Sequence, residues 1–405
     1  MEPIKFKTIN YRAGAYVYVE EQADSGEFYI IRSGKVIEDN PLNELTGEED
    51  LILEAGDFFG VLDCMSRRPH VSSIRVLEDT SLIAVRYDQF EVLIKQMSPI
   101  AMKIIRYFSN RLRKYNATIE HLTFQQKPQV DTPCNLLGVA EYYRDNGQRN
   151  LAGYAYTKYL ELCPHISDLQ SVRQQLELLN FNMQDIAPSI HGIQEIFQNE
   201  TPIFIEMEEG KDLYIILDGQ VKITKVIQGT EILLGIMKSK DIFGEMAILE
   251  NSPRSASAIA SGTVTVLRIN KNNFETHIKT YPEIARRIIE LLSDRIWLVN
   301  KRLANQLITD PVTKIYDALQ TLLQKNHIPL QKGLTYVFEM SPEEILQFIG
   351  LDTAVGKKII NQILANDPAL DIKEGKLCSQ DVYNIRSAMT LSGRLTSQPK
   401  KRTQL

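Results

Sequence analysis

A pattern of short apolar segments broken by glycine turns occurs twice along the 405-residue chain. In the second copy, residues 213–223 place two apolar runs on either side of an Asp-Gly pair, and residues 28–37 of the first copy place similar runs around a Ser-Gly pair. Such a pair between apolar runs is typical of a β-hairpin. Many short strands with glycine turns favour a small barrel or jelly roll. The sequence therefore predicts two such domains, each followed by a helix that begins near Pro99 or Pro282.

The length and composition are those of a multidomain globular protein. A chain of this length is expected to form two to four domains. Hydrophobic residues make up 43% and charged residues 24%. The net charge of −5 excludes a chain that binds polyanions over its whole surface. The N-terminus lacks the apolar core of a signal peptide and no apolar run approaches 18 residues, so we expect a cytoplasmic protein that does not enter a membrane.

The sequence contains no pattern that indicates catalysis or metal binding. The four cysteines are far apart and form no CxxC pair, which predicts free thiols in a reducing compartment rather than disulfides or a zinc site. No nucleophile–base motif, metal-ligand cluster or phosphate-binding P-loop occurs, and the six histidines are scattered singly, as surface or packing residues are. We therefore expect neither an enzyme nor a metalloprotein.

The segment 243–257, in the second copy, is the most informative about function. It places the carboxylate of Glu245 and the guanidinium of Arg254 nine residues apart. A sugar hydroxyl needs an acceptor and a phosphate needs a bidentate cation, and this segment supplies both. Glycine allows the backbone to approach a ligand closely, and a helical turn after it would direct free N–H groups at an anion. The candidate ligand-binding residues are Phe243, Gly244, Glu245, Met246, Ala247, Arg254, Ser255 and Ala256.

This segment resembles the phosphate-binding cassette of cyclic-nucleotide-binding domains, FGE-x-A-x(6)-R-[ST]-A-[ST], at every fixed position. In that family the Glu holds the ribose 2′-OH and the Arg holds the cyclic phosphate. The resemblance implies these roles for Glu245 and Arg254, with cAMP or cGMP as the regulatory ligand and no metal. The alternative is an ordinary β-turn-β segment with a surface ion pair.

The first copy lacks both ligand-holding residues. Aligning Gly60 with Gly244 puts Val61 in the place of the cassette Glu and His70 in the place of the Arg. We interpret His70 as a surface residue. The first copy is therefore expected to be a degenerate domain kept for structure or contacts, although another small ligand stays open.

Two positions bear on the choice between cAMP and cGMP. Ser255 can donate to the phosphate whichever base is attached. When the second closing helix is aligned on that of the catabolite activator protein, Asn300 falls where that family contacts the adenine. An amide oxygen can accept from the amino group of adenine, which predicts a preference for cAMP of about 1 kcal/mol, the scale of one hydrogen bond. The alternative for Asn300 is a solvated polar residue.

Both closing helices carry apolar residues at alternating spacings of three and four. This spacing is typical of a coiled-coil seam and predicts a homodimer, whereas packing against the chain's own domains is the alternative. The residues are Ile105, Phe108, Leu112, Tyr115, Ile119 and Leu122 in the first helix, and Ile289, Leu292, Ile296, Val299 and Leu303 in the second.

Residues 133–181, between the two copies, are expected to form a helical insert. Their apolar residues have the spacing of a single tetratricopeptide repeat, except that Tyr159 stands where a small residue is usual. One such repeat cannot bury its apolar face alone, so we expect the insert to pack on flanking domains, as a spacer or as a docking surface for a protein partner. The matching residues are Leu136, Val139, Ala140, Tyr143, Ala152, Tyr156 and Pro164.

The C-terminal segment resembles the winged helix of the catabolite activator protein/Fnr superfamily. A helix after Asp310 is followed by two helices separated by a turn at Gly350 and by a β-wing that turns at Gly375. With the second copy, the resemblance covers about residues 190–390. DNA binding is one expected consequence of this resemblance.

Two features of this segment weaken the expectation of DNA binding. Where the family's recognition helix begins with a base-reading Arg and Glu, this chain has Thr353 and Ala354, which leaves Thr353, Lys357 and Lys358 as the candidate contacts. Residues 311–390 contain eight Lys/Arg against nine Asp/Glu, a net charge of −1 that provides little phosphate neutralisation.

Together these patterns predict an α+β multidomain protein with two jelly-roll β-barrel domains, each closed by a long helix. We expect a cytoplasmic cyclic-nucleotide sensor that regulates transcription as a homodimer. The alternative is a nucleotide-controlled protein-interaction module that does not bind DNA. The expected domains are a degenerate cyclic-nucleotide-binding-like domain (1–125), a tetratricopeptide-like insert (133–182), a cyclic-nucleotide-binding domain (186–308), a winged helix-turn-helix (309–390) and a basic disordered tail (391–405).

Overall fold

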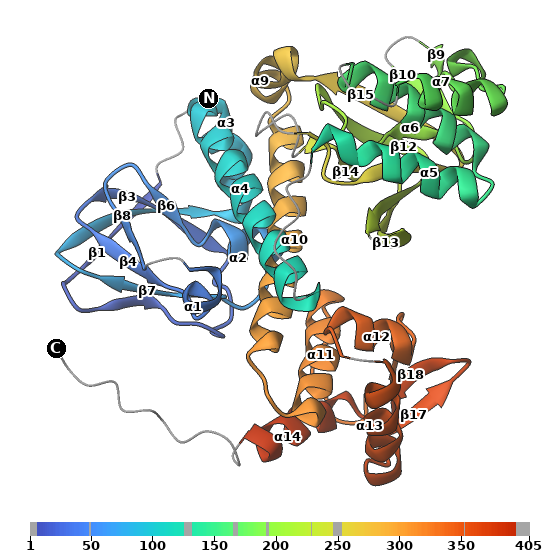
Figure 1. Ribbon diagram of the computed structural model, residues 1–405. Coiled ribbons are helices and arrows are strands. Elements are labelled where there is room, and N and C mark those ends of the chain that lie inside the picture. Colours follow the sequence, from blue (N-terminus) through green and yellow to red (C-terminus); the bar gives the residue numbers. More distant parts are fainter. Residues whose placement is uncertain are drawn as a thin grey trace. The chain divides into compact units, whose positions relative to one another are not determined.

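The computed structural model describes residues 6–47, 50–124, 132–164, 169–191, 194–227, 229–245, 253–351 and 353–393 (Figure 1). The chain combines helices and sheets and divides into two compact units. One unit comprises residues 1–89, 111–127 and 293–405, and the other comprises residues 90–110 and 128–292. The boundary falls within two long helices, α4 (Ser98–Phe124) and α10 (Pro282–Gln306). Most of the predicted basic tail, from residue 394 on, lies outside the described residues.

The first copy folds into two four-stranded antiparallel sheets, in the strand orders β1-β8-β3-β6 and β2-β7-β4-β5. Their inner faces bury a cluster that includes Ile31, Val36, Ile74 and Leu82, which gives the jelly-roll-like domain that the sequence predicts. The strands are β1 (Lys7–Tyr11), β2 (Tyr16–Tyr18), β3 (Glu27–Ser33), β4 (Val36–Asp39), β5 (Leu51–Leu53), β6 (Phe58–Phe59), β7 (Ser73–Val76) and β8 (Thr80–Arg86). The short helices are α1 (Asn43–Thr46), α2 (Val61–Ser66) and, in the other unit, α3 (Phe90–Gln96).

The second copy forms a seven-stranded antiparallel sheet, in the order β13-β12-β15-β10-β9, with β11 on β15 and β14 on β12. Its core includes Ile216, Val221, Ala258 and Val266. Helix α9 (Lys271–Thr280) follows the last strand. The strands are β9 (Ser189–His191), β10 (Gln194–Phe197), β11 (Pro202–Phe204), β12 (Asp212–Ile227), β13 (Thr230–Met237), β14 (Ile242–Phe243) and β15 (Ser257–Asn270).

The two predicted hairpins at the glycine turns are wrong. Strand β12 runs without interruption through Gly219, where its register with β15 shifts, and Gly34 leads the chain from β3 in one sheet to β4 in the other. Both glycines have a positive φ, +89° and +91°. A Cβ at Gly219 would lie 2.4 Å from the carbonyl oxygen of Thr263, and one at Gly34 would lie 2.3 Å from Oγ1 of Thr80. These glycines therefore permit a bulge and a corner against a neighbouring strand rather than a hairpin turn.

The insert consists of α5 (Leu136–Asp145), α6 (Arg149–Leu162) and α7 (Leu169–Leu178), preceded by the 3-10 turn η2 (Pro133–Asn135). Its predicted apolar residues are buried, except Pro164, which is exposed. They share one hydrophobic cluster with Ile205, Met207 and Ile259 of the second copy. The insert therefore packs on a flanking domain, as expected for a unit that cannot bury its apolar face alone.

The C-terminal segment contains four helices and a three-stranded sheet in the order β16-β18-β17. The side chain of Ser341 accepts from the main-chain N–H of Glu344, and the Glu344 side chain accepts in return, which caps α12. The β17–β18 hairpin turns at Gly375 as predicted. The elements are α11 (Pro311–Lys325), β16 (Tyr336–Val337), α12 (Pro342–Phe348), α13 (Thr353–Asn366), β17 (Leu370–Lys373), β18 (Lys376–Ser379) and α14 (Val382–Gly393).

The apolar stripes of α4 and α10 are mostly buried within a single chain. In α4 the stripe is buried from Ile105 to Tyr115, Ile119 is half-buried and Leu122 is 37% exposed, whereas the whole stripe of α10 is buried. Intrachain packing, the alternative reading of the sequence, accounts for the buried side chains, and a homodimer formed through these helices stays a prediction. None of the described helices combines the length and apolar character that crossing a membrane requires.

Candidate functional site

Strand β14 delivers the cassette to one end of the second copy. The strand ends at Phe243, Gly244 follows with a φ of +76°, and Glu245 is buried. The Phe243 ring stacks on the Tyr214 ring with 5.2 Å between centroids, which fixes the segment to the core. Two predicted ligand-binding residues, Met246 and Ala247, lie outside the described residues.

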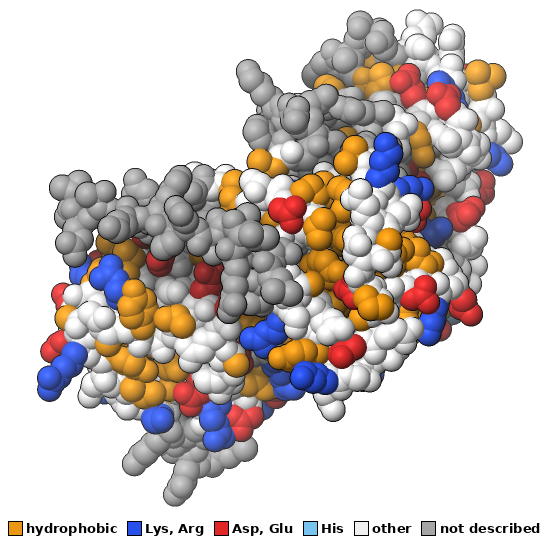
Figure 2. All heavy atoms as spheres, turned by 90° about the horizontal axis from the view of Figure 1, so that it is seen from below, with side chains coloured by type: hydrophobic (Ala, Val, Ile, Leu, Met, Phe, Trp, Pro, Cys, Tyr) orange, Lys and Arg blue, Asp and Glu red, His pale blue; other side chains and the backbone are white. Residues whose placement is uncertain are grey.

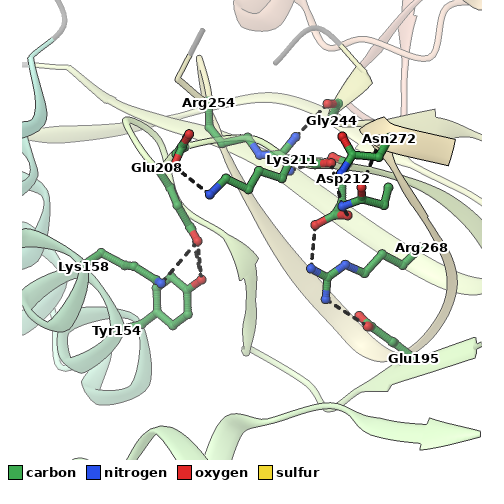
Figure 3. Close-up of polar contacts among 12 residues, drawn as sticks. Tyr154, Lys158, Glu195, Glu208, Lys211, Asp212, Gly244, Arg254, Arg268 and Asn272 are labelled. Atoms are coloured by element: carbon green, nitrogen blue, oxygen red, sulfur yellow. Dashed lines mark hydrogen bonds and ion pairs between the residues drawn. The ribbon is translucent and has the colours of Figure 1, made fainter. Parts of the chain in front are cut away.

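Arg254 is buried beside Gly244 and is held by main-chain oxygens. Its Nη1 donates to the carbonyl oxygen of Gly244 and its Nη2 donates to the carbonyl oxygen of Asp212, each at 2.7 Å (Figure 3). The guanidinium carbon lies 4.0 Å from the centroid of the Phe204 ring. Nε is buried and has no hydrogen-bond partner among the described residues. Arg254 is only 5% exposed, and its Nε is thus a buried donor without a partner among the described residues.

Burial dominates the electrostatics of this arginine. It lowers the pKa of Arg254 from its ordinary value, and the nearby Tyr214, Glu208, Asp212 and Glu245 offset that effect in part. An arginine remains charged even so, because its ordinary pKa exceeds 12. A buried cation held by neutral carbonyl oxygens is poorly compensated compared with one in an ion pair. The arrangement therefore favours an incoming anion that can accept several N–H groups at once.

Gly244 is required by the close approach of Arg254. A Cβ at this position would lie 2.6 Å from Nη1 of Arg254 and 3.2 Å from the ring of Phe204. The positive φ at Gly244 also disfavours any other residue. The structure therefore gives Gly244 a packing reason that sequence reasoning did not foresee, while close approach of a ligand to its backbone stays a prediction.

Sequence reasoning missed Asp212, which links Arg254 to helix α9. While its carbonyl oxygen accepts from Arg254, its carboxylate accepts from Nη2 of Arg268 at 2.6 Å and from Nδ2 of Asn270 at 2.8 Å (Figure 3). The side chain of Asn270 caps α9 by accepting from the N–H of Asn272. Asp212 thus joins the cassette arginine to the first turn of the helix that follows the barrel.

Glu208, also missed, links Arg254 to the insert. The main-chain N–H of Arg254 donates to the Glu208 carbonyl oxygen at 2.8 Å. The Glu208 carboxylate accepts from the hydroxyl of Tyr154 at 3.0 Å and lies 3.6 Å from Nζ of Lys158 (Figure 3). Tyr154 and Lys158 are both on α6. No sequence pattern indicates either residue, because Asp212 and Glu208 meet Arg254 through main-chain oxygens that any residue type carries.

The remaining predicted ligand residues are placed differently. Ser255 is exposed and Ala256 is buried, both next to Arg254 along the chain. Asn300 belongs to the other compact unit and is 4% exposed. Its alternative reading as a solvated polar residue is therefore wrong, and within the described part of the chain its Nδ2 has no hydrogen-bond partner.

In the first copy, the prediction that His70 is a surface residue is wrong. It is 2% exposed, its Nδ1 lies 2.8 Å from Oδ2 of Asp63, and its ring stacks on Tyr18 with 3.7 Å between centroids. Val61, in the place of the cassette Glu, is buried as well. Burial raises the pKa of Asp63, and the contact with His70 opposes that rise. The two residues aligned with Glu245 and Arg254 are therefore both buried within the first copy.

The three candidate DNA contacts lie on α13. Thr353 is its first residue, and both lysines are exposed. Nζ of Lys357 forms an ion pair with Glu343 at 2.9 Å, which offsets its charge. Of the two lysines, Lys358 is the one for which no such pair is seen among the described residues.

Comparison with known proteins identifies both repeated domains and a set of relatives. The cyclic nucleotide-binding domain family matches residues 8–97 and 194–281. The CRP-like cAMP-activated global transcriptional regulator of Mycobacterium tuberculosis is 31% identical over 165 residues, which is 40% of this chain and 72% of that protein. The global nitrogen regulator of a Nostoc species is 23% identical over 230 residues (56% and 99%). The cyclic AMP receptor protein of Thermus thermophilus is 23% identical over 171 residues (42% and 76%).

Proposed function

Because the chain belongs to the Crp-like family of cyclic nucleotide-binding proteins, we propose that it is a transcription regulator controlled by a cyclic nucleotide held by Arg254 and Glu245. The observation that carries the proposal is the buried guanidinium of Arg254, whose Nε has no partner in the described residues and whose Nη groups donate only to main-chain oxygens. A phosphate in this place would accept charge-assisted hydrogen bonds, which are about twice as strong as neutral ones. The carboxylate of Glu245 would accept from a ribose hydroxyl.

We propose that binding is transmitted to α9 through Asp212. A phosphate that takes the Nη groups of Arg254 competes with the carbonyl oxygen of Asp212 for the same donors. A shift of Asp212 would act on Asn270, which both donates to its carboxylate and caps α9. Helix α9 leads directly into α10, so the second closing helix is the natural recipient of the change.

We propose cAMP as the ligand, preferred over cGMP by about 1 kcal/mol, the scale of one hydrogen bond. The cAMP named in the M. tuberculosis relative supports this choice. Asn300 lies in the other compact unit and gives this choice no support, since an amide can donate to guanine as readily as accept from adenine. Competition in which cGMP displaces cAMP at a lower concentration than unlabelled cAMP does would overturn the preference.

We propose that the first copy binds no cyclic nucleotide. The stacked pair of Tyr18 and His70, with Asp63 bonded to the histidine, supports this reading. This reading leaves the first copy without a cyclic nucleotide.

The contribution of the first copy would be structural. Arg68 forms an ion pair with Asp294 and lies over the Trp297 ring, at 4.8 Å from the ring centroid. These contacts, made within one compact unit, hold the second half of α10 against the first copy.

For the C-terminal segment we propose a winged helix with α13 as its recognition helix. The order of its elements supports the fold, and Gly356 lets α13 pack closely on α12, since a Cβ there would lie 2.4 Å from a methyl group of Leu346. The net charge of −1 over residues 311–390 argues for modest DNA affinity. On the face in Figure 2, basic and acidic side chains are interspersed.

The contact between the insert and Glu208 favours a second candidate, a nucleotide-controlled protein-interaction module that acts through the insert. The two candidates differ in DNA affinity and in its dependence on salt. A regulator that uses α13 should bind duplex DNA more tightly with cAMP, with affinity that falls as salt rises. Lys358→Ala should reduce that affinity for all sequences alike. No cAMP-dependent DNA binding at low salt would favour the interaction module.

Calorimetric titration with cAMP, cGMP and cyclic dinucleotides tests the site itself. Losing a hydrogen-bonded charge costs about 1.5–3 kcal/mol, so Arg254→Ala should weaken cAMP binding by about 10- to 100-fold or more, and Glu245→Ala by less. His70→Gln in the first copy is the matched control and should leave the affinity unchanged. If the Arg254 and Glu245 variants bind cAMP like the parent, the site assignment is wrong.

A further inference from the structure

Two cysteines that are 29 residues apart in the sequence meet in the insert. Cys134 lies in the turn η2, just before α5, and Cys163 follows the last residue of α6. Their sulfur atoms are 3.6 Å apart. Both cysteines are free thiols, as the sequence predicts, but their distance along the chain gives no sign of this contact. The two thiols stand at the open end of the α5–α6 hairpin, where its first and last residues come together.

The two thiols differ in exposure. Cys134 is exposed, whereas Cys163 is only 8% exposed. Burial, together with the hydrogen bond to Cys134, raises the pKa of Cys163 to about 11. The other two cysteines, Cys64 and Cys378, are fully buried. An oxidant in solution can therefore reach Cys134 first, with Cys163 next to it as the second thiol.

The surrounding backbone keeps the two sulfurs close. The η2 turn is closed by hydrogen bonds between Thr132 and Asn135, and the N–H of Cys163 donates to the carbonyl oxygen of Tyr159. A disulfide has an S–S length of about 2.05 Å, so the sulfurs need to approach by about 1.5 Å. A metal site is not the explanation in the described residues, where no cluster of three or more His, Cys, Asp and Glu suited to a metal occurs.

We propose that Cys134 and Cys163 form a redox modification site at which a hydroperoxide converts the two thiols into a disulfide. In the first step the Cys134 sulfur takes an oxygen from hydrogen peroxide as the O–O bond breaks, which gives a sulfenic acid and water. In the second step the Cys163 sulfur attacks the Cys134 sulfur, the S–S bond forms, and the hydroxyl leaves with the thiol proton as a second water. Two thiols are oxidised and one peroxide is reduced. A dithiol reductant reverses the reaction.

The disulfide would staple the ends of the α5–α6 hairpin. A single helical hairpin cannot bury its apolar face alone, and this one depends on packing against Ile205, Met207 and Ile259 of the second copy. A cross-link that closes the hairpin restricts its unfolded states and so stabilises it. Oxidation should therefore slow the local opening of α5 and α6.

The full chain, reduced and freed of reductant, should be treated with stoichiometric hydrogen peroxide and mapped by mass spectrometry after denaturing alkylation. The expected result is a cross-linked peptide pair containing Cys134 and Cys163, about 2 Da lighter than the sum of the reduced peptides. Cys163→Ser should accumulate a sulfenic acid at Cys134 that dimedone traps, whereas Cys134→Ser should accumulate none at Cys163. Cys378→Ser is the matched control and should form the same cross-link as the parent.

Hydrogen exchange on the same samples tests whether the disulfide stabilises the α5–α6 hairpin. Amides of α5 and α6 should exchange more slowly in the oxidised parent than in the reduced parent, and peroxide should not slow exchange in Cys163→Ser. Full alkylation of both cysteines after peroxide, or a cross-link between two chains, would overturn the modification site. A cross-link that leaves exchange unchanged would overturn the stapling of the hairpin. None of these outcomes depends on nucleotide binding.

Discussion

The hydroxyl of Tyr154 donates a hydrogen bond to the carboxylate of Glu208, with 3.0 Å between the oxygen atoms. The same glutamate accepts the main-chain N–H of Arg254 with its carbonyl oxygen. A residue of the helical insert is thus two hydrogen bonds away from the arginine proposed to hold the phosphate. The insert is thus linked by hydrogen bonds to the backbone of Arg254, and we expect it to help position that residue.

Removing this hydroxyl should weaken nucleotide binding. In Tyr154→Phe the ring still packs but Glu208 loses one donor, so the loop that carries Arg254 is held less firmly. We expect cAMP affinity to fall about three- to fivefold, within the scale of one hydrogen bond. Tyr142→Phe, a change of the same size on α5, should bind like the parent. Equal calorimetric affinity of Tyr154→Phe and the parent would show that the insert does not position the site.

Separating the buried pair in the first copy should destabilise it. His70→Ala leaves the buried carboxylate of Asp63 without its partner, which costs about 3–5 kcal/mol of unfolding free energy. The double change Asp63→Asn with His70→Ala should recover part of that loss, because no unpaired charge remains. Denaturant titrations of the parent, both single variants and the double variant measure the coupling. Additive effects would mean that the pair contributes no mutual stabilisation.

A charge on the buried stripe of α10 should unfold the chain rather than separate subunits. Leu292 is fully buried in one chain, so Leu292→Lys places an ammonium in an apolar interior and should cost several kcal/mol. Leu122→Lys, at an exposed position on α4, is the control and should have little effect on stability. Denaturant titration and sedimentation should be run together. A stably folded Leu292→Lys with half the parent's mass would show that the stripe joins two copies.

The cap of α11 should make stability depend on pH. The carboxylate of Asp310 accepts from the N–H and hydroxyl of Thr313, and these bonds lower the pKa of Asp310 from its ordinary 3.8. A lowered carboxyl pKa adds stability that is complete above the ordinary value and is lost as the pH falls through the folded value. Near pH 7, Asp310→Ala should lose about 1 kcal/mol. That difference should shrink below about pH 4, while a neutral cap in Asp310→Ser should show no such trend.

The cassette could be predicted from sequence because its chemistry is carried by side-chain types at a fixed spacing. Gly244, Glu245 and Arg254 do lie close together, although the glycine is needed for packing against Arg254 and the binding of a ligand stays a prediction. Asp212 and Glu208 could not be found in this way. Each meets Arg254 through a main-chain oxygen, and that partnership depends on which loops the barrel brings together.

Prediction of the fold from sequence has the same limits. Apolar spacing predicted the helices of the insert and the buried stripes of α4 and α10, because burial of one face leaves a periodic record. Spacing does not reveal what covers a face, so the stripes read equally well as a dimer seam. The turn signal at Gly219 failed because a bulge and a hairpin both require a positive φ. His70 was misplaced because its partners, Asp63 and Tyr18, are identified only in three dimensions.

The burial of Val61 and His70 in the first copy has an evolutionary consequence. Restoring the cassette there requires Val61→Glu and His70→Arg, and each change alone is unfavourable. The first puts a carboxylate at a fully buried position, and the second removes the partner of Asp63. Stability would decline before any ligand affinity appeared, so selection has no gradual route back. If, as proposed, the first copy binds no nucleotide, its loss of binding would be difficult to reverse and nucleotide sensing would stay with the second copy.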